Sequence, residues 1–448
     1  MKKLLLLPFL CLLSVCASAD DPAGIKFFNG SWNDVLAEAR RQNKPIFVDV
    51  YTTWCGPCKQ MAKEAFPDPK VAGKFNASFI NYKIDAEKGE GIDIARRYAV
   101  TGYPTSLYVS ASGDLIHREM GYGGIQHLLA GAAKALEAAK DPKPLSVWEQ
   151  ELKAGKRDAE FLYGYLQKRA AVGMPDGEAL EAYLNVIPES EWFSEKNLPV
   201  VGNNLSTSRS RAFDALMTKI PALPMSQAKT QAMMRIQMAL YDDFKEAVKT
   251  KDETALNDFI RRQMQAMELF RPTTAARKEE MIDQYRMQFY QQTKNMDKFR
   301  PLAAARARKM MEIPTDTLRA KDLSAYKRFE QQAAMMPDSV KKSDDYRKHV
   351  ERMKKTETGM TASGLNNLAW TYSQNTTDPA DLNAALAWSQ RSLELDRQTA
   401  YLDTYAQLLN KLGRKKEAIP FAEEAVRQAK AKGEDAAQYE KNLEQIKK

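Results

Sequence analysis

The chain has 448 residues, 44% of them hydrophobic, and is therefore long enough to bury cores without disulfide staples. Its formal net charge of +9 is mild for this length, and the basic residues form no block with interleaved aromatic residues. This composition excludes a protein dominated by nucleic-acid binding, and we expect no nucleic-acid partner.

Residues 1–19, MKKLLLLPFLCLLSVCASA, have the pattern of a cleaved signal peptide. Two lysines precede a leucine-rich run, and the final ASA fits the small-x-small site of signal peptidase. The run is shorter than the ~20 residues that span a bilayer, which argues against an uncleaved anchor. A lipid anchor on Cys16 is a less favoured alternative, because Val15 stands where a lipoprotein box has a small residue. The sequence thus predicts export, and a periplasmic protein if the source is a Gram-negative bacterium.

Residues 20–140 alternate between helical and strand-like patterns. Ser31 and Asp34 form a capping box before a helix that ends near Asn43. Short apolar runs at 46–51 and 79–84 predict buried strands, and a helix is expected around 91–98. Two further runs, 106–109 and 115–120, flank a turn and predict an antiparallel hairpin, followed by a last helix from Ile125. These elements predict a small α/β domain.

A proline-containing linker, 141–145, separates this domain from about three hundred residues without strand patterns. The helical region 146–355 is compatible with an ordinary helical bundle. A divergent helical hairpin is equally compatible, with Phe161, Leu162 and Tyr165 facing Ala179, Leu180 and Tyr183.

Residues 356–448 contain an internal repetition. One helix carries Leu365, Leu368, Ala369 and Tyr372, and a second set at the same spacing, Leu402, Tyr405, Ala406 and Leu409, follows 37 residues later. Small residues at Ala385 and Ser392 are matched 33 residues later by Ala418 and Ala425. This pattern resembles tetratricopeptide repeats, whose paired helices cross at small residues and present a surface to a protein partner.

Cys55 and Cys58 are the two cysteines that remain after signal cleavage. Covalent haem attachment needs a histidine after the second cysteine, where this chain has Lys59. A zinc site needs two further ligands, and none of the three histidines has a ligand-like spacing. A disulfide that closes so short a loop constrains the unfolded chain little. Thiol–disulfide exchange remains, and we expect neither a metal nor a cofactor.

The position of the pair supports this chemistry. Cys55 lies between a buried strand and a helix that begins near Pro57, where helix N–H groups and the helix dipole favour a thiolate. Cys55 is thus the expected attacking thiol, and Cys58, one turn later, the expected resolving thiol. Gly56 permits the tight turn, and Pro57 fits a first helical turn.

The motif WCGPCK at 54–59, directly after the strand, resembles thioredoxin. The resemblance extends from Phe27 to Lys140 and implies an α/β thioredoxin fold, followed here by an all-α helical-repeat region. It includes Asp49, the buried acid that the family uses to move protons to and from the second cysteine. It also includes GYPT at 102–105, in which Pro104 matches a cis proline that faces the disulfide.

The resemblance assigns roles to the residues around the pair. The implied catalytic residues are Cys55, Cys58 and Asp49, and the implied substrate-binding residues are Trp54, Gly56, Pro57, Tyr103 and Pro104. The lysine that thioredoxin has beside the buried acid is matched by Asn81, with Lys83 two residues along the same strand face. The stretch 65–71 is more similar to the periplasmic reductant DsbD than to cytosolic thioredoxin.

The sequence therefore predicts an exported thiol–disulfide oxidoreductase, a reductase or isomerase, whose helical region binds a partner. Its partners would be proteins with disulfides and a membrane or soluble dithiol that supplies electrons. The alternative is a protein-binding scaffold with a mainly structural thioredoxin domain. An intact pair of thiols in a WCGPC motif argues against that alternative.

Overall fold

The structure is a computed structural model that describes residues 24–270, 272–334, 336 and 341–448. The predicted signal peptide and the lipid-anchor alternative at Cys16 lie outside these residues. The chain divides into two compact units, the first ending at Asp243 and the second beginning at Phe244, within helix α11 (Gln227–Thr250). None of the helices in the described ranges is both long and apolar enough to span a membrane.

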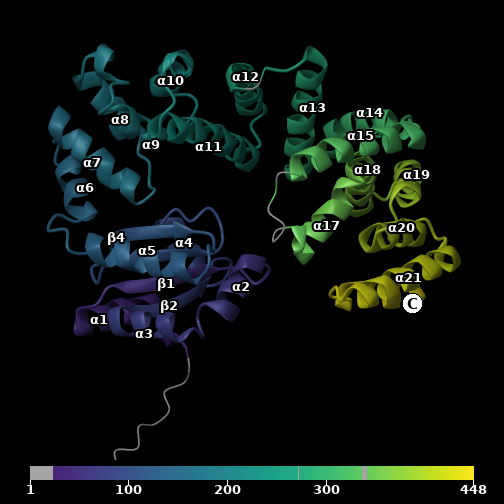
Figure 1. Cartoon of the computed structure of the whole chain (residues 1–448), viewed down its shortest axis with the longest axis horizontal. Helices are drawn as coiled ribbons and strands as arrows, with labels where there is room; N and C mark the ends of the chain where they lie inside the picture. The colour runs from purple at the N-terminus through teal and green to yellow at the C-terminus, as the bar shows by residue number, and fades with distance from the viewer. Residues whose placement is uncertain (1–23, 271, 335, 337–340) are drawn as a thin grey trace, which may run out of the picture. The chain divides into compact units, whose positions relative to one another are not determined.

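The first unit contains a sheet that helices flank (Figure 1). The sheet has four strands in the order β2-β1-β3-β4. Its strands are β1 (Ile46–Tyr51), β2 (Ile80–Asp85), β3 (Thr105–Val109) and β4 (Leu115–Met120). β1 is parallel to β2 and antiparallel to β3, and β3 pairs with β4 in the predicted hairpin. The predicted α/β fold is confirmed, and strand ends differ from the prediction by a single residue.

Helices cover both faces of this sheet. They are α1 (Trp32–Gln42), α2 (Gly56–Glu64), α3 (Pro69–Ser78), α4 (Gly91–Arg97) and α5 (Ile125–Ala138). Phe47 and Tyr108, paired across β1 and β3, pack with residues of α2, α3 and α5 into one apolar core. Trp32 of α1 contacts Tyr82 and Tyr98 on the other face, with ring centroids about 6 Å apart.

The predicted capping box of α1 is present, because the Ser31 hydroxyl accepts from the Asp34 amide and the Asp34 carboxylate accepts from the Ser31 amide. Helix α3 was not predicted. Asp68 caps its N-terminus by accepting from the amides of Lys70 and Val71, and Pro69 occupies its first turn.

The first unit continues into α6 (Leu145–Lys153), α7 (Ala159–Ala171), α8 (Gly177–Val186), α9 (Leu198–Asn204) and α10 (Arg211–Lys219). Contacts join these helices to the α/β part. Lys168 of α7 forms an ion pair with Asp141, and Arg118 of β4 packs against Gly173, which follows α7. α7 and α8 pack together, and their six predicted core positions are buried. The division of the chain at 141–145 stays a prediction.

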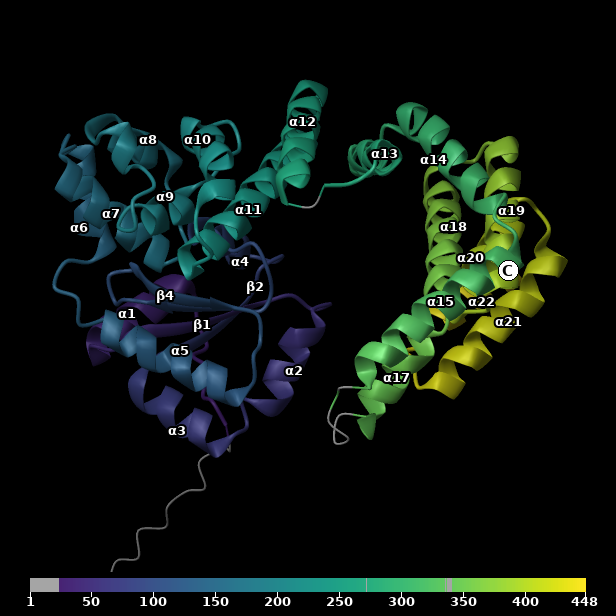
Figure 2. The ribbon, with the colours of Figure 1, turned by 45° about the horizontal axis from the view of Figure 1, so that its top comes forward.

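The second unit is a succession of paired helices (Figure 2). They are α12 (Glu253–Phe270), α13 (Ala275–Gln292), α14 (Met296–Met311), α15 (Thr315–Ala333), α17 (Asp344–Met353), α18 (Thr356–Asn375), α19 (Pro379–Leu395), α20 (Thr399–Lys411), α21 (Lys415–Lys432) and α22 (Ala437–Lys447). Asp322 of α15 caps the N-terminus of another helix, α18. Its buried carboxylate accepts hydrogen bonds from the backbone amides of Glu357 and Thr358.

The repeated pattern of the C-terminal residues corresponds to the pairs α18–α19 and α20–α21. The small residues Ala385, Ser392, Ala418 and Ala425 are fully buried where helices pack together. Tyr372 contacts Trp388 within the first pair, with ring centroids 4.8 Å apart. The predicted helical-repeat region is confirmed.

Candidate redox site

Cys55 and Cys58 form a disulfide at the start of α2. Cys55 is the N-cap residue, and its Sγ accepts a hydrogen bond from the Cys58 amide at 3.1 Å. Gly56 and Pro57 form the first two positions of the helix, which begins one residue before the predicted start near Pro57. The Cys55 sulfur therefore receives a helix N–H, and this donor would stabilise a Cys55 thiolate once the disulfide is reduced.

Trp54 and Tyr103 flank the disulfide-bearing loop. The Trp54 side chain is 64% exposed, and its ring meets that of Tyr103 edge-on at 6.0 Å. The Tyr103–Pro104 peptide bond is cis, which confirms that prediction. Because Val50 pairs with Thr105, the cis bond lies at the end of β1 from which the chain runs on to Cys55.

Asp49 lies in the middle of β1 and is 3% exposed. Burial raises the pKa of its carboxyl to about 7, and the nearby Lys83 ammonium opposes this rise. The Asp49 Oδ1 atom has no hydrogen-bond partner among the described residues. A carboxyl with a pKa near neutrality can take up or release a proton under physiological conditions.

The register between β1 and β2 shows which residue lies beside Asp49. The strand register pairs Asn81 with Phe47, whereas Asp49 pairs with Lys83. Asn81 instead donates a hydrogen bond from its side chain to the Lys26 carbonyl and so holds the segment before α1. The residue beside the buried acid on β2 is therefore Lys83.

Replacing Lys83 by methionine is expected to raise the pKa of Asp49 above its present value of about 7, because the variant removes the neighbouring positive charge. The carbon chemical shift of the Asp49 carboxyl, followed by NMR during a pH titration, measures this change. Lys88→Met is the matched control, because Lys88 lies beyond the end of β2 and forms an ion pair with Asp85. An unchanged titration in Lys83→Met would show that the ammonium does not act on Asp49.

Two contacts of the site were not predicted. The Trp54 indole donates to both carboxylate oxygens of Glu87, at 3.1 and 3.0 Å. Met120 lies against Gly102. A Cβ atom added at Gly102 would be 2.9 Å from the Met120 sulfur. The contact between Trp54 and Glu87 could have been inferred from the parallel pairing of β1 and β2, because parallel strands end at the same edge of a sheet. The position of Met120 could have been inferred from the hairpin, which brings the end of β4 beside the start of β3.

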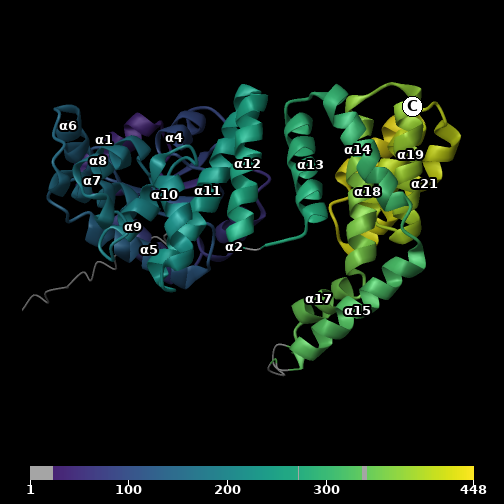
Figure 3. The same cartoon turned by 90° about the horizontal axis from the view of Figure 1, so that it is seen from above.

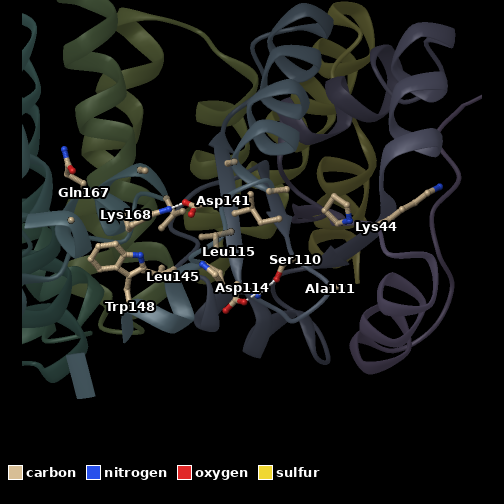
Figure 4. Close-up of a pocket in the computed structure, with 18 of the residues that line it drawn as sticks. Lys44, Ser110, Ala111, Asp114, Leu115, Asp141, Leu145, Trp148, Gln167 and Lys168 are labelled. Atoms are coloured by element: carbon tan, nitrogen blue, oxygen red, sulfur yellow. Dashed lines mark hydrogen bonds and ion pairs between the residues drawn. The ribbon is translucent and has the colours of Figure 1, made fainter. Parts of the chain in front are cut away.

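A cavity of about 870 Å³ lies at the opposite end of the sheet. Residues before β1, including Lys44, and residues after β3, including Ser110, line it together with Trp148 and the Asp141–Lys168 pair (Figure 4). Cys55 and Pro104 lie at the other ends of these strands, so this cavity is separate from the disulfide. Within the described part of the chain, no three His, Cys, Asp or Glu side chains form a possible metal site.

The strand order, the N-capping cysteine and the cis proline define a thioredoxin-like domain. Residues 23–110 match the family model Thioredox_DsbH, with the description "Protein of unknown function, DUF255". The thiol:disulfide interchange protein DsbD of Yersinia pestis is 34% identical over 83 residues, 18% of this chain and 14% of the relative. DsbD of Salmonella typhi is 31% identical over 100 residues, 22% of this chain and 18% of the relative. The chain thus matches only a small part of these relatives.

Solved structures also resemble the α/β part. A candidate disulphide-isomerase from Bacteroides thetaiotaomicron is 41% identical, with 26% of this chain and 95% of that chain covered and a TM-score of 0.25. A thioredoxin from Thermus thermophilus is 24% identical, with 25% and 88% covered and a TM-score of 0.24.

Proposed function

We propose that this protein is an exported thiol–disulfide oxidoreductase that reduces or isomerises disulfides in other proteins. The observation that carries the proposal is the position of Cys55 at the N-terminus of α2. Its sulfur accepts a hydrogen bond from the Cys58 amide and forms a disulfide with Cys58. Similarity to interchange proteins named DsbD supports the same chemistry. Export and a periplasmic location are supported by the sequence of residues 1–19.

The reaction begins with the reduced pair. The Cys55 thiolate attacks one sulfur of a substrate disulfide, a mixed disulfide forms, and the other substrate sulfur leaves as a thiolate. Cys58 then loses its proton, for which we propose Asp49 as the acceptor, and attacks the Cys55 sulfur. The second substrate sulfur leaves, so two electrons have passed to the substrate and the Cys55–Cys58 disulfide has formed. A dithiol of another protein must reduce this disulfide before the next cycle.

Trp54, Gly56, Pro57, Tyr103 and Pro104 are proposed to contact the substrate polypeptide around the disulfide. Trp54 supports this role because its side chain is largely exposed beside Tyr103. In the proposed complex, the backbone at Tyr103 pairs with the substrate as an added strand would.

We further propose that the helical region binds a protein partner and that its C-terminal pairs are tetratricopeptide-like. The repeated small residues at the helix crossings support this assignment. In the alternative of a pure scaffold, the α/β domain would be structural. The arrangement of Cys55 at a helix N-terminus favours the redox function over that alternative, because a structural disulfide needs no stabilised thiolate.

The reduction potential of the Cys55–Cys58 pair tests the proposed direction of electron flow. Because Gly-Pro separates the cysteines as in strongly reducing thioredoxins, we expect a value near ~-270 mV after equilibration with dithiothreitol or glutathione. Quantification of the two redox forms by mass spectrometry after thiol alkylation provides the measurement. A value more than ~100 mV higher would indicate a more stable dithiol and assign the protein to the oxidants or the isomerases instead of the reductases.

A further inference from the structure

A groove of about 450 Å³ lies between α13, α14 and α18 in the second unit. Figure 3 shows these three helices next to one another. The floor of the groove is apolar, because Met287, Phe299 and Leu368 line it and are buried. Helices α14 and α18 approach closely at Gly364 of α18. A Cβ atom added at Gly364 would lie 2.9 Å from the sulfur of Met310 on α14.

Amide side chains form the polar wall of this groove. Gln284, Gln288 and Gln291 occupy one face of α13, and Asn367 projects from α18. Gln291 donates to the Thr371 hydroxyl at 2.9 Å, which joins α13 to α18. The side chains of the other three amides are exposed and have no hydrogen-bond partner within the described residues.

Each of these amides offers one acceptor and two hydrogens, and can therefore pair with both the N–H and the C=O of a polypeptide backbone. The row on α13 spans seven residue steps, from Gln284 to Gln291, or about 10 Å of helix. An extended peptide covers this length with about three residues. The three glutamines, four and three residues apart on one helix face, can therefore reach successive peptide units of such a segment.

Arg306 of α14 adds one positive charge to the groove. Its side chain is half-buried, and no carboxylate pairs with it in the part of the chain that the structure describes. Arg300 on the same helix, by contrast, pairs with Asp381 at 3.0 Å. A planar guanidinium favours a carboxylate that accepts two parallel hydrogen bonds. Trp370, 39% exposed, also lines the groove and offers an aromatic face.

We propose that this groove binds an extended polypeptide segment that carries a carboxylate. The amides hold the backbone of the segment, Arg306 binds its carboxylate, and Trp370 packs on a neighbouring apolar side chain. The inference rests on the partner-binding role proposed above for the helical region and specifies the chemistry of the partner. A single cation among neutral amides gives selectivity for one acidic position rather than for a polyanion.

The full chain, immobilised and tested against a library of random linear dodecapeptides, is expected to select sequences enriched in aspartate or glutamate. The best peptide, synthesised with its acid replaced by the matching amide, should bind roughly tenfold or more weakly. Arg306→Gln should cause a similar loss with the original peptide. On this variant the replacement of the peptide acid should have no further effect, because the two groups act on each other.

Arg308→Gln is the matched control, because Arg308 is exposed on the same helix and does not line the groove. It should bind the selected peptide as the unmodified chain does. Reduction of insulin by the unmodified full chain is measured in parallel, so that a failure of peptide binding is distinguished from a failure of the redox function. Selection of no peptide, of peptides without an essential acid, or equal binding by Arg306→Gln would overturn the proposal.

Discussion

Replacing Cys55 by serine is expected to reduce the rate of insulin disulfide reduction to that of the dithiothreitol buffer. The hydroxyl of serine remains protonated at neutral pH, so the substrate disulfide meets no thiolate. The fold should persist, because loss of a disulfide that closes so short a loop costs at most about 2 kcal/mol. Turbidity of the insulin B chain measures the rate, and circular dichroism measures the fold.

Cys58→Ser is the matched variant, and its expected result differs. Cys55 can still attack, but no neighbouring thiol resolves the product, so a covalent adduct with the substrate should accumulate and appear in the mass spectrum under non-reducing conditions. If the adduct forms on Cys55→Ser and not on Cys58→Ser, the order of attack proposed here is reversed. Retention of reductase activity by Cys55→Ser would remove the proposed function.

The elements around the cysteines could be predicted because local rules determine them. The apolar run at 46–51, the capping box at Ser31 and the hairpin turn each depend on neighbouring residues, and each is present. Helix α3 was missed although Asp68 and Pro69 carry an N-cap signal, because its apolar pattern is short.

The neighbours of the site depend on the arrangement of strands and not on local sequence. The partner of Asp49 follows from the register between β1 and β2, and a shift of two residues exchanges Lys83 for Asn81 on the same face. Glu87 meets Trp54 only because the ends of two parallel strands lie side by side. The pairing of helices in residues 146–355 likewise depends on packing between faces that are similarly amphipathic, which periodicity alone does not determine.

Replacing Asp49 by asparagine is expected to change stability and activity in opposite directions. The carboxyl has a pKa of about 7 in the folded protein against 3.8 when it is exposed. Below pH 4 both states hold the proton, and between about pH 4 and 7 only the folded state does, so wild-type stability falls as pH rises and reaches its full loss above pH 7. The difference between the two pKa values corresponds to about 4 kcal/mol.

Asparagine does not titrate, so the free energy of unfolding of Asp49→Asn relative to wild type should increase by up to about 4 kcal/mol between pH 4 and pH 8. Urea unfolding at several pH values measures this difference. Asp34→Asn provides a control of opposite sign, because hydrogen bonds from Ser31 lower the pKa of the exposed Asp34 carboxyl. That variant should lose stability relative to wild type as pH rises towards 3.8, and its difference from wild type should change little between pH 5 and pH 8.

The same Asp49→Asn substitution should slow insulin reduction by on the order of 100-fold, because the variant lacks the proposed proton acceptor for Cys58. The buried Asp49 carboxyl lowers stability at neutral pH, and its Oδ1 atom has no hydrogen-bond partner among the described residues. If the variant is more stable but slower, the loss of rate would explain why an aspartate occupies this position. An unchanged rate would leave Asp49 as a structural residue. A stability difference that is independent of pH would show that burial does not raise its pKa.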